Sequence, residues 1–510
     1  MAIAAFALLT AASLLPTLLT PIPAMVDYLN HLARMYLLSQ IGTPDANPYY
    51  EAAWALYPNL AMDMIVPQMA RLVGVEDATR LFLLLSQLLI IGGAIALERI
   101  VKGYVHIAGF AALMFLYCLP FTWGFVNFEF GLGLALWGVA AYLFVAERTW
   151  PTRFAVNLIF VTGLFAAHLF ALGVYGATLG LHELWRVRDR KLSYCELALQ
   201  LVVIATPAVV LLALMQLTTS SIGSEGLTWN LEFKPIWIFR IMNGYNLTVS
   251  AATALTLLAS LYLAAKRGFL KLTPPGVWLA VGFFLLYLAI PSELRGTSFV
   301  DLRLIPAAAL IIPAFCSLSL PDRRWTVAAL TIASGITLAN LATVFVVWLS
   351  YRGDYAAIIE SFHNIDRGSL VLVATAGNGE DPPFNDLTKY PMVYAPTLAV
   401  YYANAFVPNV FTEVGKQPVQ VRSAVQRLAL PHGGSMPADT LTAIATGRTL
   451  PEVPSFVRTW YRDYDYLYVL GQGVTNPMPN LLEELDRSAR FVLYKIRRTP
   501  LDASSVRIPF

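Results

Sequence analysis

The sequence predicts a polytopic α-helical membrane protein of about 11 transmembrane helices with a C-terminal external α/β domain. The chain is 57% hydrophobic and only 13% charged, whereas about a quarter of the residues in a soluble domain are charged. Apolar runs of bilayer length recur from the first residues to about 350, and a mixed α/β pattern follows. We therefore expect a transmembrane domain over 1–350, with a first external loop at 22–78 carrying amphipathic helices, and an external domain over 351–510.

The apolar runs predict spans at 3–21, 79–98, 104–121, 130–147, 196–216, 247–265, 275–291, 304–320 and 325–350. The first run has no basic residues before it, so we expect an uncleaved helix rather than a signal peptide. Five basic clusters separate the later runs, at 99–102, 148–153, 186–191, 266–271 and 323–324. If all five are cytoplasmic, stretch 154–185 must cross twice, as two short helices with His168 at the turn. Stretch 59–74 is then a surface or re-entrant helix that does not cross.

Beyond 351 the pattern predicts strands at 369–374, 465–470 and 490–496 and helices at 355–362 and 479–488. This tail shows no acid–base constellation of its own. We therefore expect it to cover a catalytic cavity or to select an acceptor, without catalytic residues.

The sequence predicts a helix with one polar face just after the first span. In a helix, Asp27, Asn30, His31 and Arg34 stand at i, i+3, i+4 and i+7 and share one side. Apolar residues, among them Leu29, fall on the opposite side, as in a helix lying at a membrane surface. This face has two interpretations, an active-site face or the solvated face of an interfacial helix.

Other polar residues sit at membrane depth or at the mouths of spans, and the predicted topology puts them on the same non-cytoplasmic side. Such residues are candidates for function, and they are Glu129, His168, Arg295, Asp301 and Arg303. A structural ion pair for Glu129, a hydrogen-bonded core histidine for His168 and snorkelling arginines are the alternatives.

The sequence does not support a nucleic-acid partner, a metal or a cofactor. The net charge of +3 comes without a basic stripe, so we expect no nucleic-acid partner. The three cysteines indicate neither a disulfide framework nor a metal site. A divalent cation held by Asp27, His31 and Glu129 is an alternative, but their spacing matches no metal motif, so we expect no metal and no cofactor.

The arrangement resembles the membrane glycosyltransferases of the GT-C class, such as the protein O-mannosyltransferases and the lipid A aminoarabinose transferases. Asp27 stands where these enzymes carry an acid in the first external loop, and Tyr57-Pro58-Asn59-Leu60 resembles their Pro-containing entry to the next helix. The chain departs from the pattern at Tyr28, where a second acid is usual.

The resemblance implies transfer of a sugar from a polyprenyl-phosphate carrier to a lipid, glycan or protein acceptor. It implies a bacterial inner-membrane protein whose active site and tail face the periplasm, and an inverting, metal-independent reaction. Asp27 would be the catalytic base and Arg34, Arg295 and Arg303 would bind phosphate. The remaining candidates for substrate binding are Asn30, His31, Glu129, His168 and Asp301.

Two other functions remain open. The missing second acid fits a non-catalytic subunit that binds a lipid-linked glycan. A transporter or flippase is the other alternative, although such proteins usually show internal repeats, and none is visible in this sequence.

Overall fold

The computed structural model describes residues 1–189, 191–218, 226–294, 297–377, 391–448, 450 and 453–497. The chain divides into two compact units. The first contains Met1–Pro21, Ala55–Ile65 and Arg80–Val347, and the second contains Ile22–Trp54, Val66–Thr79 and Trp348–Phe510. These boundaries differ from the domains expected over 1–350 and 351–510, because most of the first loop belongs to the same unit as the tail.

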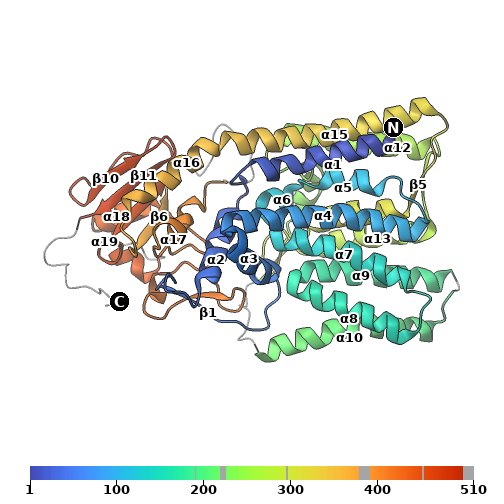
Figure 1. Ribbon diagram of the computed structural model, residues 1–510, viewed down its shortest axis with the longest axis horizontal. Helices are drawn as coiled ribbons and strands as arrows, with labels where there is room; N and C mark the ends of the chain where they lie inside the picture. Colours follow the sequence, from blue (N-terminus) through green and yellow to red (C-terminus); the bar gives the residue numbers. More distant parts are fainter. Residues whose placement is uncertain are drawn as a thin grey trace. The chain divides into compact units, whose positions relative to one another are not determined.

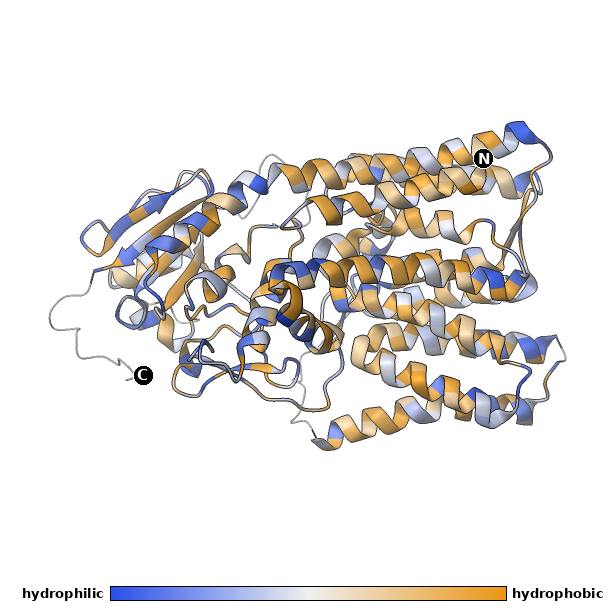
Figure 2. Cartoon of the chain, viewed as in Figure 1, coloured by the Kyte–Doolittle hydropathy of each residue, from blue (hydrophilic) through white to orange (hydrophobic). Residues whose placement is uncertain are grey.

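The first unit is a helical bundle in which α7 packs against α8 and α9, and α10 packs against the same two helices (Figure 1). Most residues of its helices are hydrophobic (Figure 2), as expected for helices that cross a membrane. Its helices are α1 (Ala2–Leu19), α4 (Val75–Lys102), α5 (Ala108–Phe115), α6 (Leu119–Trp123), α7 (Val126–Phe144), α8 (Trp150–Ala167), α9 (Leu169–Arg188), α10 (Tyr194–Thr218), α11 (Lys234–Arg240), α12 (Leu247–Lys266), α13 (Pro274–Ala289), α14 (Leu304–Ile311) and α15 (Arg323–Ser350).

Within the described residues, 7 helices are long and apolar enough to cross a membrane. They are α1, α4, α7, α8, α10, α12 and the long helical stretch Arg323–Asn364, which begins with α15. The polytopic membrane fold expected from the sequence is therefore confirmed. The predicted spans at 104–121, 275–291 and 304–320 correspond to shorter apolar helices.

Two of these spans are interrupted. The span expected over 104–121 is divided into α5 and α6, with Pro120 in the first turn of α6, where proline is well tolerated. The span expected over 304–320 ends in a 3-10 turn at Ile312–Phe315. The chain then forms β5 (Cys316–Leu318), which pairs antiparallel with β3 (Leu270–Leu272). An apolar run alone does not distinguish these cases from a continuous helix.

The stretch 154–185 does form two helices, and the break falls at His168, as predicted. His168 is both the C-cap of α8 and the N-cap of α9. The helices contain 18 and 20 residues because they extend beyond the predicted stretch at both ends. The helix predicted near 59–74 is α3 (Ala61–Val73), which has 13 residues, fewer than the roughly 20 that a transmembrane helix needs.

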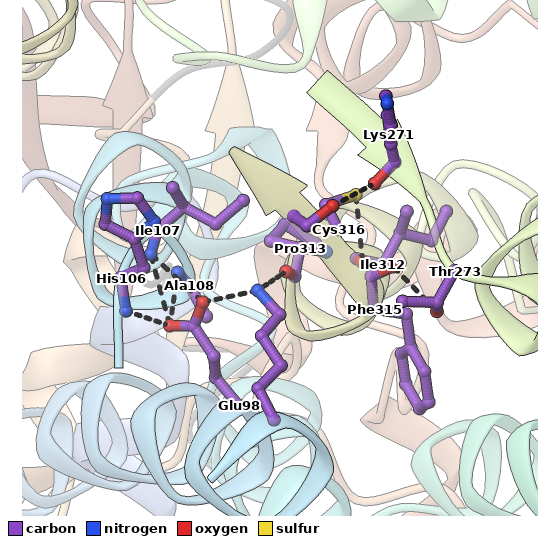
Figure 3. A network of polar contacts seen from close by, with 12 residues as sticks. Glu98, His106, Ile107, Ala108, Lys271, Thr273, Ile312, Pro313, Phe315 and Cys316 are labelled. Atoms are coloured by element: carbon purple, nitrogen blue, oxygen red, sulfur yellow. Dashed lines mark hydrogen bonds and ion pairs between the residues drawn. The ribbon is translucent and has the colours of Figure 1, made fainter. Parts of the chain in front are cut away.

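A buried carboxylate joins several helices of the first unit at one end of α4. Glu98 accepts hydrogen bonds from the backbone N–H groups of His106, Ile107 and Ala108 at 2.9–3.2 Å (Figure 3). These donors belong to the start of α5, which has no side-chain cap of its own, so Glu98 replaces the missing cap. Lys102 pairs with Glu98 at 2.6 Å and also donates to the carbonyl of Pro313.

We expect Glu98→Gln to lower the free energy of unfolding by roughly 3 kcal/mol, because it leaves Lys102 without a counter-charge in a buried site. The measurement is thermal or denaturant unfolding of the purified protein in detergent. Glu147→Gln is the matched control, since Glu147 is exposed. Equal stability of the two variants would contradict the assignment of Glu98 as a structural cap.

The second unit contains a five-stranded mixed sheet in the order β10-β11-β9-β6-β8. Its central strand β9 is buried throughout, and the neighbouring strand β6 is buried except at its last residue. The strands are β6 (Val371–Thr375), β8 (Met436–Pro437), β9 (Tyr466–Leu470), β10 (Leu482–Arg487) and β11 (Phe491–Ile496), and the helices around them include α16 (Arg352–Ser361), α17 (Ala399–Tyr402), α18 (Ala438–Ala445) and α19 (Trp460–Asp463).

The strands predicted near 369–374, 465–470 and 490–496 are confirmed as β6, β9 and β11. The helix predicted over 479–488 is wrong, because Leu482–Arg487 forms β10 and pairs antiparallel with β11. The Leu- and Glu-rich sequence there favours a helix locally, but pairing along the neighbouring strand overrides that preference.

The first loop is part of the second unit because it forms hydrogen bonds with the tail. β1 (Tyr50–Ala52) pairs antiparallel with β7 (Val419–Val421). Asn47 Nδ2 donates to the carbonyl of Ala405 at 3.0 Å. Helix α2 (Tyr28–Gln40) packs against the 3-10 helix η4 (Ala395–Leu398) and against α17. These pairings join residues far apart in the chain, which a sequence pattern cannot reveal.

Candidate functional site

Asp27 lies at the N-terminal end of α2, as its N-cap residue. Its side chain does not cap the helix, although aspartate is a favoured capping residue. Its backbone carbonyl accepts from the N–H of His31 at 3.0 Å. The carboxylate is half-buried and interacts electrostatically with the hydroxyl of Tyr394. The carboxylate of Asp27 therefore does not play the structural role that the side chain of an N-cap residue usually has.

Asn30 occupies the same face but serves the fold. Its Nδ2 donates to the carbonyl of Asn409, and its Oδ1 accepts from the N–H of Phe411, both at 2.8 Å. The two bonds engage both ends of a fully buried amide. These bonds fix segment 409–411 against α2, and a role of Asn30 in substrate binding stays a prediction.

The interfacial interpretation of this helix is also wrong. Both the polar and the apolar side of α2 are buried, and the carbonyl of Leu29 accepts from Thr397 Oγ1 at 3.4 Å. His31 packs edge-on against Phe411, with ring centroids 5.9 Å apart. Arg34 is only 1% exposed. A helix that is buried on both its polar and its apolar side does not lie with only its apolar side against a membrane surface.

A second group of candidates meets within the first unit, and we call Arg303, Glu129 and His168 with Phe125 and Phe128 the Arg303 cluster. The Arg303 guanidinium lies over the Phe125 ring at 4.3 Å and the Phe128 ring at 5.9 Å. Its charge interacts with Glu129, which is 1% exposed. Three residues predicted from separate parts of the sequence are thus brought together.

Inside this cluster, Cys118 donates its S–H to Glu129 Oε1 at 3.5 Å. His168 packs edge-on against Phe128 at 5.5 Å, and its Nδ1 accepts from the N–H of Phe170 at 3.1 Å. This bond caps α9, so His168 has a structural role in the break between α8 and α9. Gly131 permits this approach, because a Cβ there would stand 3.1 Å from the Cβ of His168.

Asp301 belongs to a saturated ion pair rather than to an open site. Its Oδ2 accepts from Lys234 Nζ at 2.9 Å and from Ser292 Oγ at 3.0 Å, and its Oδ1 accepts from the N–H of Leu302. Lys234 also donates to the carbonyls of Tyr287 and Ile290. Since Asp301 is fully buried, these bonds give it a structural role, and its role in substrate binding stays a prediction.

Arg295, the remaining predicted phosphate ligand, lies outside the described residues. Among the residues that the structure describes, no three His, Cys, Asp or Glu side chains come together in a group that could hold a metal ion.

The structure also points to Arg240, which is not among the site residues predicted from the sequence. Its Nε is buried and has no hydrogen-bond partner among the described residues. One helical turn earlier, Trp237 contacts Phe299 at 5.6 Å, and Phe299 contacts Trp123 at 4.6 Å. Trp123 in turn contacts Phe125 of the Arg303 cluster at 5.9 Å. A continuous row of aromatic rings therefore connects the helix of Arg240 to Arg303.

Several residues close to Arg240 in the sequence have exposed apolar side chains. Phe233, Ile236 and Ile238 are 45%, 42% and 36% exposed. A guanidinium beside exposed apolar groups suits a ligand that has an anionic head and an apolar tail. The aromatic content of this segment was visible in the sequence, but only the three-dimensional structure shows that Arg240 has no carboxylate partner among the described residues.

Asn59 was also missed, although it lies in the Tyr57–Leu60 motif. It has a positive φ of 67°, which asparagine tolerates better than most residues. Its Oδ1 accepts from the N–H of Leu169, and its carbonyl accepts from Asn127 Nδ2. Asn127 Oδ1 accepts in turn from the N–H of Met62. These bonds connect the start of α3 to the start of α7 and to the break at His168.

No family model and no curated protein matches this chain. Among solved structures, the crystal structure of ArnT from Cupriavidus metallidurans bound to undecaprenyl phosphate covers 99% of this chain and 99% of its own, with a TM-score of 0.52 and 12% identity. The chain has the ArnT fold. ArnT is a lipid A aminoarabinose transferase of the GT-C class, so the structural resemblance predicted from the first loop is confirmed. At 12% identity, the likeness to ArnT is one of fold.

Proposed function

We propose that this protein is a membrane glycosyltransferase that moves a sugar from a polyprenyl-phosphate carrier to an acceptor hydroxyl. The observation that carries the proposal is the ArnT fold over the full chain, in a neighbour whose structure holds undecaprenyl phosphate. The acceptor is a lipid, a glycan or a protein. We further propose that the protein resides in a bacterial inner membrane, with the reaction and the tail on the periplasmic side.

In this reaction the acceptor oxygen forms a bond to the anomeric carbon while the bond from that carbon to the phosphate oxygen breaks. Asp27 takes the proton of the acceptor hydroxyl. The polyprenyl phosphate leaves with the bonding electron pair, and a single displacement inverts the anomeric configuration. Because the leaving group is an anion, it needs cations more than a general acid, and guanidiniums bind phosphate in a bidentate manner.

We assign Arg240 and Arg303 of the first unit to the carrier phosphate and retain Arg295 as a further candidate. Arg34 of the second unit stays a separately proposed phosphate-binding residue. His31 and Glu129 remain proposed substrate-binding groups, while His168 acts mainly through the shape of the α8–α9 break. With these cations available from the chain itself, we favour a metal-independent transfer.

The test of the carrier site is Arg240→Ala. We expect the affinity for undecaprenyl phosphate to fall about tenfold or more, because a charge-assisted hydrogen bond is lost. The measurement is equilibrium binding of labelled undecaprenyl phosphate to the protein in lipid nanodiscs.

Arg267→Ala is the matched control, since Arg267 follows the opposite end of α12 and stacks on Trp325 at 4.4 Å. The control should bind the carrier as the wild type does. Equal losses in both variants would show that the effect is not specific to the proposed site. Unchanged binding in Arg240→Ala would remove Arg240 from it.

One observation favours a second candidate function, a non-catalytic subunit that binds a lipid-linked glycan. Tyr28 stands where a second acid is usual in the first loop, and it is fully buried. Such a protein would bind the same carrier but would transfer no sugar. Direct assay of transfer from a panel of undecaprenyl-phosphate sugars separates the two functions.

A further inference from the structure

Tyr394 belongs to the tail, yet it faces the same surroundings as Asp27. Its ring packs edge-on against Phe411, with centroids 5.0 Å apart, and Phe411 also contacts the ring of His31. His31 stands one helical turn from Asp27, on the same side of α2. Phe411 therefore contacts both Tyr394 and a residue on the face of α2 that carries Asp27.

The backbone around Tyr394 is tied to α2. Thr397 Oγ1 donates to the carbonyl of Tyr394 at 2.6 Å and lies 3.4 Å from the carbonyl of Leu29. Asn30 holds the N–H of Phe411, as described above. Hydrogen bonds thus fix the backbone near both Tyr394 and Phe411 to α2. These bonds define the position of the Tyr394 hydroxyl relative to Asp27.

Gly433 lies close to the Tyr394 hydroxyl, at a position where a side chain would not fit. A Cβ at Gly433 would lie 3.0 Å from Tyr394 Oη and would clash with Phe411. Gly433 also has a φ of +83°, which glycine adopts without strain. No described residue forms a hydrogen bond with the Tyr394 hydroxyl.

The hydroxyl remains protonated at neutral pH. Burial raises the pKa of Tyr394 above its ordinary value, and the negative charge of Asp27 raises it further. A neutral hydroxyl can both donate and accept a hydrogen bond. A neutral donor beside a carboxylate fits a hydroxylated, uncharged group, whereas a phosphate would be repelled by Asp27.

We propose that Tyr394 is a substrate-contacting residue of the Asp27 site, where its hydroxyl binds a hydroxyl-bearing group of the acceptor or of the transferred sugar. This inference rests on the proposed function. It departs from the expectation that the tail has no part in the chemistry, because the tail then supplies a group that orients the reacting substrate next to its base.

The test is Tyr394→Phe, which removes only the oxygen and keeps the ring against Phe411. We expect the KM for one substrate to rise roughly tenfold, as for the loss of one hydrogen bond, while thermal stability stays unchanged. A rise in the KM for the acceptor identifies the acceptor as the ligand, and a rise in the KM for the undecaprenyl-phosphate sugar identifies the sugar. Transfer kinetics of the wild type and the variant would show either result.

Tyr401→Phe is the matched control. Tyr401 also lies in the tail and also packs on α2, through Tyr36 at 4.7 Å, but far along the helix from Asp27. It should leave both KM values unchanged. The inference is overturned if Tyr394→Phe has the same kinetics as the wild type, while the proposed function then stands.

If the wild type transfers no sugar, the proposed function fails, and binding decides the inference separately. Equilibrium binding of undecaprenyl phosphate mannose is then compared with binding of bare undecaprenyl phosphate. A loss of affinity confined to the sugar-bearing ligand in Tyr394→Phe supports the contact. Equal affinities of variant and wild type for both ligands overturn it.

Discussion

Asp27→Asn is expected to leave the protein folded in the membrane and to lower the rate of sugar transfer by about 10²–10⁴-fold, the usual cost of losing a general base. The substitution preserves the shape of the side chain and removes its charge, and an amide cannot take the acceptor proton at neutral pH. Helix α2 should be unaffected, because the Asp27 side chain does not cap it. The measurement is the initial rate of transfer from an undecaprenyl-phosphate sugar to its acceptor.

Asp45→Asn is the control for this experiment, since Asp45 is exposed and belongs to the same loop. It should keep the wild-type rate. Full activity of Asp27→Asn would place the base elsewhere, with Glu129 and Asp63 the next residues to test. If even the wild type transfers no sugar but binds the carrier, the protein is a binding subunit with the fold of an enzyme.

Lys234→Met is expected to destabilise the protein by about 3–5 kcal/mol, because it leaves the Asp301 carboxylate buried without a counter-charge. Both partners are almost completely inaccessible, at 2% for Lys234 and 0% for Asp301. The same substitution removes the hydrogen bonds that Lys234 donates to the carbonyls of Tyr287 and Ile290. Unfolding in detergent and the yield of folded protein would both report the loss.

A second substitution distinguishes charge from packing. Lys234→Met combined with Asp301→Asn removes the orphaned charge, while the amide oxygen can still accept from Leu302. We expect this double variant to regain much of the lost stability. If the double variant is as unstable as the single one, the hydrogen bonds to the two carbonyls dominate, and the ion pair contributes little.

The parts of the fold that were predictable depend on local pattern. Long apolar runs located the spanning helices, and the alternation of basic clusters required the two helices that meet at His168. Buried strands such as Val371–Thr375 were recognisable by their composition. The pattern failed at Leu482–Arg487, where the residues favour a helix and only the partner strand β11 makes them a strand.

The same distinction between local sequence pattern and long-range contacts applies to the candidate site. Sequence spacing correctly grouped the residues of one helix face, but it cannot show which polar atoms are already occupied. Asn30 and Asp301 are ordinary candidates by residue type, and hydrogen bonds to distant residues give them structural roles. Arg240 and Tyr394 show the opposite. They became candidates because the Arg240 Nε and the Tyr394 hydroxyl form no hydrogen bonds among the described residues.

The pairing of α2 with the tail also constrains how the chain is made. Asn30 and its partner Asn409 are 379 positions apart, so at synthesis rates of about 5–20 residues per second α2 leaves the ribosome tens of seconds before its partner exists. During that interval the apolar side of α2 and the edge of β1 have nothing to cover them, which is the condition in which chaperones are needed. The proposed catalytic base, Asp27, is therefore set in place only as the last third of the chain is completed, and an incomplete chain would lack a positioned Asp27 until then.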